Sequence, residues 1–217
     1  GDIEDALKII SGSKSRIILK GSGRTDAGVH AIGQVAHFDM DTHLTEDQIK
    51  NALNFYTNKN CKIMSLCKIH DQFDSRFDAK NRTYKYQVYT GKSILYRNQA
   101  WLRSDSIDIK ILNKLADFII GEHDFLSFSK YNSEIKNTRS TIYYSKWHLE
   151  KKLLSYKICA NRFLHHMIRY LVGVMIAVSE ERFSAKHFKT LLHEPQKNVQ
   201  IHRAPACGLQ LLEVGYD

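Results

Sequence analysis

The sequence predicts an α+β fold of two related subdomains, with mixed or antiparallel sheets flanked by helices. Segments with the alternating pattern of strands are interspersed with segments of helical periodicity. Several expected strands follow one another as hairpins, which disfavours a parallel doubly wound sheet. The two halves of the chain also show a similar order of elements, and no low-complexity linker separates them. We therefore expect subdomains over residues 1–71 and 72–217.

The first half is expected to contain two helices and three short strands. An apolar stripe predicts a helix over Asp2–Ile10. Thr45 and Gln48 form a capping-box pattern, after which apolar residues recur at helical spacing. Strands are expected at Arg16–Lys20, Gln34–Asp39 and Cys61–Ile69. Because the chain opens within a helix, we expect that a first N-terminal strand is missing.

The second half contains the clearest strand, Thr83–Thr90, in which Tyr84, Tyr86 and Val88 share one face. A helix over Ile107–Ile120 is expected to stop at Gly121, a usual C-cap residue. A hairpin is expected from Thr141–Leu149 and Leu153–Cys159. Two helices follow, at Phe163–Val178 and at Ala185–His193 after a Ser184 cap, and Cys207–Val214 is expected to form the final strand.

Composition narrows the class of protein. The 217 residues carry 32 Lys and Arg against 23 Asp and Glu, a net charge of +9, which suggests a polyanionic partner, although a solvated surface can be equally basic. No stretch approaches the ~18 apolar residues of a membrane span, and the N-terminus lacks the apolar core of a signal peptide. The four cysteines form no CxxC pair, so we expect free thiols and a cytoplasmic protein.

The most unusual segment is the glycine-rich run from Gly21 to His30. It fits neither phosphate-binding fingerprint, because Asp26 stands where a third glycine belongs and Val29 stands where a P-loop has lysine. We therefore expect no nucleotide cofactor. The run instead presents Asp26 on a tight turn, with Arg24 to keep the carboxylate ionised. Such a carboxylate suits covalent chemistry at a sugar C1′, and the alternative is an Asp–Arg pair that caps a loop.

The run GRTDAGVHA resembles the signature of the tRNA pseudouridine synthase A family, the tRNA pseudouridine(38-40) synthases. Phe73–Phe77 followed by Arg82–Tyr86 is similar to the family's F-x-x-R-F and R-x-Y-x-Y segment. Phe163–Gly173 is similar to its F-x-H-x-M-x-R-x-x-V-G helix, and Ala204–Leu209 to its A-P-x-x-G-L close. The resemblance runs from residue 1 to the end. It implies the pseudouridine synthase fold, with the catalytic cleft between the two subdomains.

The resemblance also implies a reaction, the isomerisation of uridine to pseudouridine at positions 38, 39 and 40 in the anticodon stem-loop of tRNA. The C1′–N1 bond breaks, the uracil turns over, and a C1′–C5 bond forms. Asp26 would be the nucleophile, attacking either C1′ or the uracil ring. The target base must first be flipped out of its stack, and Arg24 would hold the flipped conformation through the flanking phosphates.

Two further residues receive roles from the resemblance. Tyr84 would stack on the flipped uracil and act in the later proton transfer at C5, whereas Tyr86 is expected to be an ordinary core aromatic. Arg169 interrupts an otherwise apolar helix, where a lone arginine would usually extend its charged end to solvent. The resemblance favours an ion pair between Arg169 and Asp26, which would keep the carboxylate ionised.

Binding of tRNA is expected to come from two segments and from a second subunit. Arg76 would contact a phosphate or a base, and a polar loop over Asn132–Lys136 would add cationic contacts. The other expected RNA-binding residues are Phe73, Asp74, Ser75, Phe77, Lys130 and Lys136. The resemblance further implies a homodimer whose paired clefts bind one tRNA.

We expect neither a metal nor an organic cofactor. His165 and His166 are adjacent, and on a helix adjacent side chains point about 100° apart, which disfavours one shared ion. The competing hypothesis is a non-catalytic tRNA-binding or tRNA-folding protein on the same scaffold. The combination of Asp26, Arg24 and Tyr84 favours the enzyme, because a pure RNA binder gains nothing from a carboxylate in its cleft.

Overall fold

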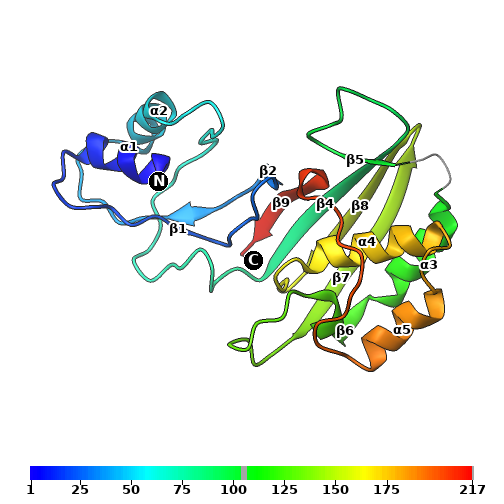
Figure 1. Cartoon of the computed structure of the whole chain (residues 1–217). Coiled ribbons are helices and arrows are strands. Elements are labelled where there is room, and N and C mark those ends of the chain that lie inside the picture. The colour runs from blue at the N-terminus through cyan, green and yellow to red at the C-terminus, as the bar shows by residue number, and fades with distance from the viewer. Residues whose placement is uncertain (104–106, 217) are drawn as a thin grey trace. The chain divides into compact units, whose positions relative to one another are not determined.

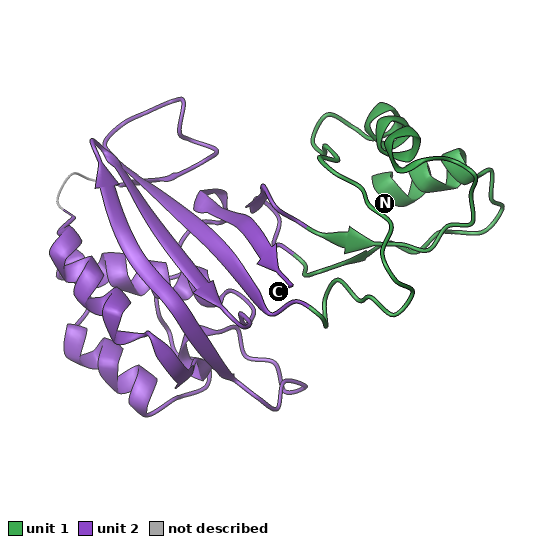
Figure 2. Cartoon of the chain, turned by 180° about the vertical axis from the view of Figure 1, so that it is seen from behind, with its two compact units in different colours: residues 1–24, 35–78 green, residues 25–34, 79–217 purple. Residues whose placement is uncertain are grey.

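The computed structural model describes residues 1–103 and 107–216, which form two compact units (Figure 1, Figure 2). The first unit comprises Gly1–Arg24 and Val35–Asp78, and the second comprises Thr25–Gln34 and Ala79–Asp217. Helices and a mixed sheet make the protein α+β, as the sequence predicts. The glycine-rich segment 25–34 belongs to the second unit, whereas the sequence suggests a single boundary near residue 71.

Two helices form the core of the first unit. Helix α1 (Asp2–Ser11) ends at Gly12, whose φ of +65° is the left-handed conformation that glycine adopts without strain. Helix α2 (Glu46–Tyr56) begins at the Thr45 capping box, which confirms that prediction. Strands β1 (Lys20–Gly21) and β3 (Ala36–His37) pair antiparallel. The buried contacts between the helices come from Ala6, Leu7, Ile49 and Leu53.

All three strands expected in this half of the chain are shorter or absent: Gln34–Asp39 is reduced to the two residues of β3, and in the other two segments side chains satisfy the backbone. Of Arg16–Lys20 only Lys20 is in a strand, and the Leu19 N–H donates to the Glu4 carboxylate at 3.2 Å. The segment 61–69 forms no strand. There Asn54 takes the place of a neighbouring strand: its amide accepts from the Ile63 N–H at 2.8 Å and donates to the Ile63 carbonyl at 2.9 Å.

The second unit is built on a seven-stranded sheet in the order β2-β9-β4-β8-β7-β6, with β5 beside β4. The β7–β8 hairpin is antiparallel, as predicted, and so are the β4–β8, β4–β9 and β6–β7 pairs, whereas β2–β9 and β4–β5 are parallel. The strands are β2 (His30–Ala31), β4 (Asn81–Thr90), β5 (Trp101–Arg103), β6 (Gly121–Asp124), β7 (Arg139–Glu150), β8 (Leu153–Ala160) and β9 (Leu209–Gly215).

Helices cover one face of this sheet (Figure 1). They are α3 (Ile109–Phe118), α4 (Met167–Ser179) and α5 (Ala185–His193), with short 3-10 turns at Leu126–Phe128 and Ala206–Gly208. The Trp147 ring stacks on Tyr156 with centroids 4.8 Å apart, and its indole N–H donates to the Met175 sulfur at 3.5 Å. All three side chains are fully buried, so they fix α4 against the sheet. No helix among the described residues has both the length and the apolar character to cross a bilayer.

Helix ends in this unit differ from their predicted positions in two informative places. The α5 helix and its Ser184 cap lie where predicted. Helix α3 already ends at Phe118, and Gly121, with φ of +99°, begins β6 instead of capping the helix. Helix α4 begins at Met167 and not at Phe163, because His166 takes a left-handed backbone with φ of +64°. The residues before Met167 are therefore not helical, which matters for the site.

Candidate active site

The loop that carries Asp26 is fixed to the large sheet of the second unit. The Val29 N–H donates to the Asp26 carbonyl at 3.0 Å, which closes a turn, and Gly28 has a φ of +83° that favours glycine. Two residues later the chain enters β2, which pairs with β9. A Cβ on Gly33 would lie 2.2 Å from the Leu212 carbonyl oxygen, so only glycine allows this close approach. The loop is thus a rigid turn with its carboxylate partly exposed.

Three side chains from the first turn of α4 and the two residues before it surround the Asp26 carboxylate. Arg169 Nη1 lies 2.7 Å from Oδ2, and His166 Nε2 lies 3.0 Å from the same oxygen. His165 Nε2 lies 3.3 Å from Oδ1. The expected contact between Arg169 and Asp26 is therefore present. The left-handed backbone at His166 bends the chain so that both adjacent histidines face one carboxylate.

Arg169 is held to Ala204 through both its side chain and its backbone. Its Nε donates to the Ala204 carbonyl at 2.8 Å, and the Ala204 N–H donates back to the Arg169 carbonyl at 2.9 Å. The segment around Ala204 passes close over α4, since a Cβ on Gly173 would lie 2.2 Å from the His202 carbonyl oxygen. Only 11% of the Arg169 side chain is exposed. The guanidinium therefore meets Asp26 in a fixed orientation.

The charges around Asp26 keep it ionised and keep one neighbour neutral. Burial alone would raise the pKa of Asp26, but the Arg169 hydrogen bond and the nearby positive charges hold that pKa below its usual value. Burial lowers the pKa of His166 to about 4, and the charges of Arg203 and Arg169 add to that effect against the opposing charge of Asp26. At neutral pH the site therefore holds a carboxylate, a guanidinium and a neutral imidazole.

Tyr84 lies on β4 within the electrostatic reach of Asp26. Its ring meets Phe163 edge to face, with centroids 5.2 Å apart. Burial raises the pKa of Tyr84, and the negative charge of Asp26 raises it further, so the phenol keeps its proton at neutral pH. Tyr86, by contrast, is fully buried and donates its hydroxyl proton to the Pro205 carbonyl at 2.8 Å. Tyr86 is thus the core aromatic that the sequence suggests.

The two histidines form a cluster that we did not predict. Asp26, His165 and His166 bring ligand atoms within 4.8 Å of one another, and the histidine rings lie 3.9 Å apart. The prediction that the two rings diverge was wrong, because it assumed a regular helix. Their donors do not suit a cation, however: Arg169 contacts Asp26, and Arg203 Nη1 lies 3.0 Å from His166 Nδ1. Two fixed positive charges therefore oppose a metal ion here.

Comparison with known proteins shows the family of the chain. Residues 3–78 and 115–217 match the sequence profile of the tRNA pseudouridine synthase family. The chain belongs to the tRNA pseudouridine synthase family. It is 35% identical over 218 residues to the tRNA pseudouridine synthase A of Ehrlichia chaffeensis, covering 99% of this chain and 88% of that protein. The tRNA pseudouridine synthases A of Bacillus licheniformis and Anoxybacillus flavithermus are 31% and 32% identical, each over 100% of this chain and 88% of their own length.

The synthase family resemblance also selected residues of the first unit, and their surroundings differ. Ser75 is fully buried: its hydroxyl donates to the Lys20 carbonyl at 2.9 Å, and its N–H donates to His37 Nδ1 at 3.0 Å. Asp74 accepts from the N–H groups of Arg76 and Phe77 at 2.8 and 3.0 Å. Ser75 has no surface to offer RNA, so these two residues shape a turn.

The turn presents the side chains that follow it. Phe77 is 80% exposed, and the Arg76 guanidinium lies over its ring at 5.6 Å. Phe73 is half-buried between the rings of His37 and His70. Arg24 is exposed at the end of the first unit. An exposed aromatic beside an arginine is a common surface for single-stranded RNA.

The polar loop of the second unit begins beside the histidine pair. The Lys130 N–H donates to the His165 carbonyl at 2.9 Å, so the loop is tied to the residue that contacts Asp26. The side chains of Lys130 and Lys136 are both exposed. Both cationic side chains are therefore accessible to solvent.

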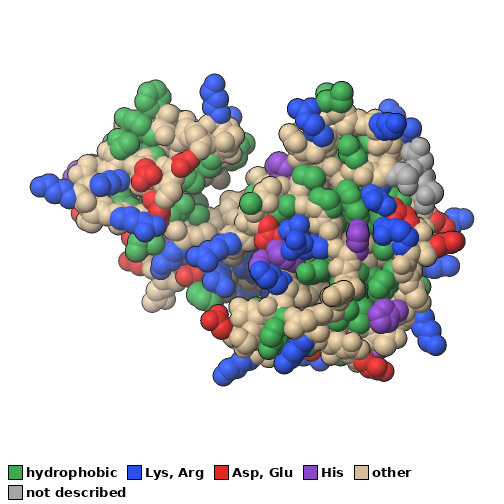
Figure 3. Space-filling model, in the orientation of Figure 1, with side chains coloured by type: hydrophobic (Ala, Val, Ile, Leu, Met, Phe, Trp, Pro, Cys, Tyr) green, Lys and Arg blue, Asp and Glu red, His purple; other side chains and the backbone are tan. Residues whose placement is uncertain are grey.

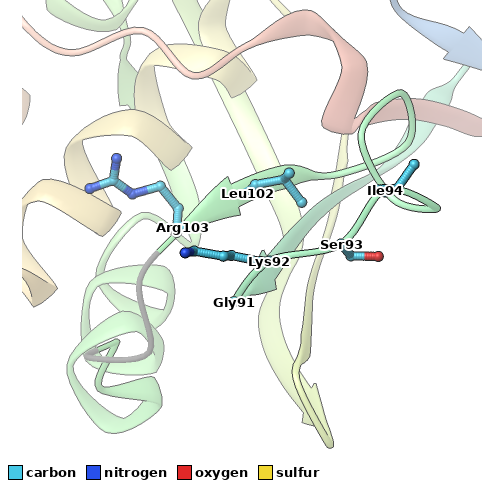
Figure 4. A pocket seen from close by; sticks show the side chains of 6 residues that line it. All are labelled: Gly91, Lys92, Ser93, Ile94, Leu102 and Arg103. Carbon is cyan, nitrogen blue, oxygen red and sulfur yellow. The ribbon is translucent and has the colours of Figure 1, made fainter.

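A surface hollow of about 470 Å³ lies elsewhere, at the ends of β4 and β5 (Figure 4). None of its lining residues belongs to the family motifs or contacts Asp26. Arg103 is already paired, with its Nε 2.8 Å from the Glu180 carboxylate. The hollow is lined by Gly91, Lys92, Ser93, Ile94, Leu102 and Arg103. It offers no convergent set of polar groups, so it is a poor candidate for the reaction.

Proposed function

We propose that this chain converts uridine to pseudouridine in the anticodon arm of tRNA, at positions 38, 39 and 40, with Asp26 as the nucleophile. The observation that carries the proposal is the state of the Asp26 carboxylate. It is held by Arg169 at 2.7 Å and is kept ionised, and 26% of its side-chain surface is exposed to solvent. A rigid, ionised and accessible carboxylate is suited to attack on a ribose C1′ or on the uracil ring.

By either route the C1′–N1 bond breaks with its electron pair leaving on the uracil, and the bond that Asp26 forms, to C1′ or to the uracil ring, is broken again before the product leaves. The detached uracil must stay in the site while it turns, and C5 then bonds to C1′ and loses its proton. Tyr84 supports the proposal as a stacking surface, because its ring is held edge to face by Phe163. Its raised pKa keeps the phenol protonated, which suits a hydrogen-bond donor to the uracil better than an acceptor of the C5 proton.

Recognition of the tRNA is proposed to rest on charge and stacking. Lys and Arg side chains are spread over the face drawn in Figure 3, with Asp and Glu side chains between them. Contacts between these cations and the phosphate backbone position an RNA without reading its sequence. We propose that Arg76 and Phe77 contact the RNA from the first unit, and that Lys130 and Lys136 do so from the second. Arg24 would hold the flipped nucleotide in place.

Mapping pseudouridine in a treated tRNA transcript tests the position and the nucleophile together. Carbodiimide adducts survive alkali on pseudouridine and stop reverse transcriptase, so each modified position gives a stop. Wild type should give stops at positions 38 to 40, and Asp26→Asn should give none while still binding tRNA. Asp117→Asn is the matched control, because Asp117 is exposed on α3. Stops elsewhere would overturn the anticodon-arm assignment, and binding without any stop by wild type would favour a non-catalytic tRNA binder.

The assembly state completes the proposal. We propose a homodimer, as the family resemblance implies, and a cytoplasmic location where the tRNA pool resides. Sedimentation equilibrium should then return twice the chain mass of 25.1 kDa. A mass of 25.1 kDa at assay concentration would contradict the dimer.

A further inference from the structure

His166 has a backbone conformation that few residues other than glycine adopt. Its φ of +64° lies in the left-handed region, where a residue with a side chain is strained, although histidine is found there more often than most residue types. It is the N-cap residue of α4, but its side chain accepts no hydrogen bond from the backbone N–H groups of the helix. With this backbone conformation the imidazole points to Asp26, and its Nε2 lies 3.0 Å from Asp26 Oδ2. Strain of this kind persists only where surrounding contacts hold it, which points to a role for the side chain.

The position of the proton on His166 follows from its second partner. Arg203 Nη1 lies 3.0 Å from Nδ1, and a guanidinium has only donors, so Nδ1 must accept. The imidazole is neutral at pH 7, because the pKa of His166 is lowered to about 4, mainly by burial. The neighbouring His165, Arg203 and Arg169 also lower that pKa, whereas the charge of Asp26 opposes the shift. The single proton is therefore on Nε2, where it is donated to Asp26.

The two oxygens of Asp26 are consequently unequal. Oδ2 receives hydrogen bonds from Arg169 at 2.7 Å and from His166 at 3.0 Å, and both donor side chains are about nine-tenths buried. Oδ1 faces His165 at 3.3 Å, and that imidazole is 48% exposed. One oxygen is thus held by two buried donors, and the other faces a side chain that can move aside when substrate enters.

We propose that His166, with its tautomer fixed by Arg203, is a positioning residue that holds Asp26 by Oδ2 and leaves Oδ1 as the attacking oxygen. This inference rests on the proposed function. It differs from a merely structural role in one respect: the position of a single proton decides whether His166 attracts or repels the carboxylate. In the other tautomer, the Nε2 lone pair would face Oδ2 and push Asp26 out of place.

Nitrogen-15 NMR of the histidine side chains tests the tautomer without any activity. Wild type should show His166 protonated at Nε2 at neutral pH, whereas Arg203→Met should show a mixture of tautomers. In Arg203→Met the same signals should give a pKa above about 4, because one of the charges that lowers it is gone. Arg203→Lys retains a donor and should keep the wild-type tautomer. A wild-type imidazole protonated at Nδ1 would overturn the proposal.

Kinetics on C5-tritiated tRNA test the positioning. His166→Gly accepts the left-handed backbone, so the fold is preserved while the donor is removed. Its kcat should fall about 100-fold, the scale of a misplaced reacting group, with the KM for tRNA unchanged. Added imidazole should restore part of kcat by filling the vacated space, and His187→Asn, on the exposed side of α5, should behave as wild type.

The outcomes separate the two proposals. An inactive wild type would contradict the proposed function and leave the NMR result to judge the tautomer. An active wild type, with His166→Gly equally active and Asp26→Asn inactive, would overturn the positioning role alone.

Discussion

Replacing Arg169 by methionine removes the guanidinium from Asp26 while keeping a long unbranched side chain. The variant loses the hydrogen bond from Nη1 to Oδ2 at 2.7 Å and the one from Nε to the Ala204 carbonyl at 2.8 Å. A hydrogen bond to a charged group contributes about 1.5–3 kcal/mol. Removing one partner of a fully buried ion pair costs about 3–5 kcal/mol of stability. Because 26% of the Asp26 side chain is exposed, the range of about 1.5–3 kcal/mol applies here.

The consequence for activity can be worked from the same interaction. If the Arg169–Asp26 interaction is present at full strength in the transition state, its loss raises the barrier by about 1.5–3 kcal/mol. At 1.36 kcal/mol for each factor of ten, this corresponds to a roughly 10- to 150-fold fall in kcat/KM. The pKa of Asp26 should also rise, because burial still raises it while the Arg169 bond and charge that lowered it are gone. Because the proposed nucleophile must be ionised, activity should disappear on acidification at a higher pH than in wild type.

The assay is tritium release from C5-labelled tRNA, measured across pH with each variant. Arg169→Lys is the matched control, since it keeps the charge but lacks the planar fork that reaches both partners. Arg169→Lys should therefore keep the wild-type pH profile with a reduced kcat. An Arg169→Met variant with unchanged kcat/KM and an unchanged acid limb would refute the role given to this pair.

Three further predictions follow from the described contacts. Gly173→Ala should lower the free energy of unfolding by at least about 1–3 kcal/mol in urea melts, because the new Cβ would lie 2.2 Å from the His202 carbonyl oxygen; an unchanged midpoint would contradict that close approach. Lys130→Gln and Lys136→Gln should each weaken tRNA binding and reduce the slope of log K against log salt by about 1, and an unchanged slope would show that the lysine meets no phosphate. Because the folded-state pKa of Asp26 is lowered, the stability that it contributes is present above its unfolded pKa and is lost as pH falls through the folded value. Acid unfolding should thus be steeper in wild type than in Asp26→Asn, and equal pH dependence would contradict the lowered pKa.

The parts of the fold that the sequence predicts well are those with a local cause. The β7–β8 hairpin, the α5 helix after Ser184 and the Thr45 capping box all depend on neighbouring residues, and all are present. Strands β2, β5 and β6 were missed because they have two to four residues each. Such strands exist only through their partners, as when Ala31 pairs with Leu211. A distant partner leaves no periodicity in a two-residue segment.

The same distinction applies to the candidate site: residues that lie in sequence motifs were predicted, and neighbours that only the fold brings together were not. The family resemblance identified Asp26 and Arg169, which are 143 residues apart and meet at 2.7 Å. It did not identify His166 or Arg203 as neighbours of the carboxylate. The apolar periodicity over 163–178 predicted a continuous helix. Only a few per cent of residues other than glycine are left-handed, so nothing in the sequence marked His166 as one of them. Arg203 precedes the A-P-x-x-G-L motif, and only the fold brings it to His166.

Tritium release from C5-labelled tRNA by wild type and Asp26→Asn, without added metal or nucleotide, tests the central claim most directly. Forming the C1′–C5 bond expels the C5 hydrogen, so released tritium counts turnovers. The account predicts release by wild type and none by Asp26→Asn, with tRNA binding retained in both. Release by Asp26→Asn at the wild-type rate would contradict the assignment of Asp26 as the nucleophile.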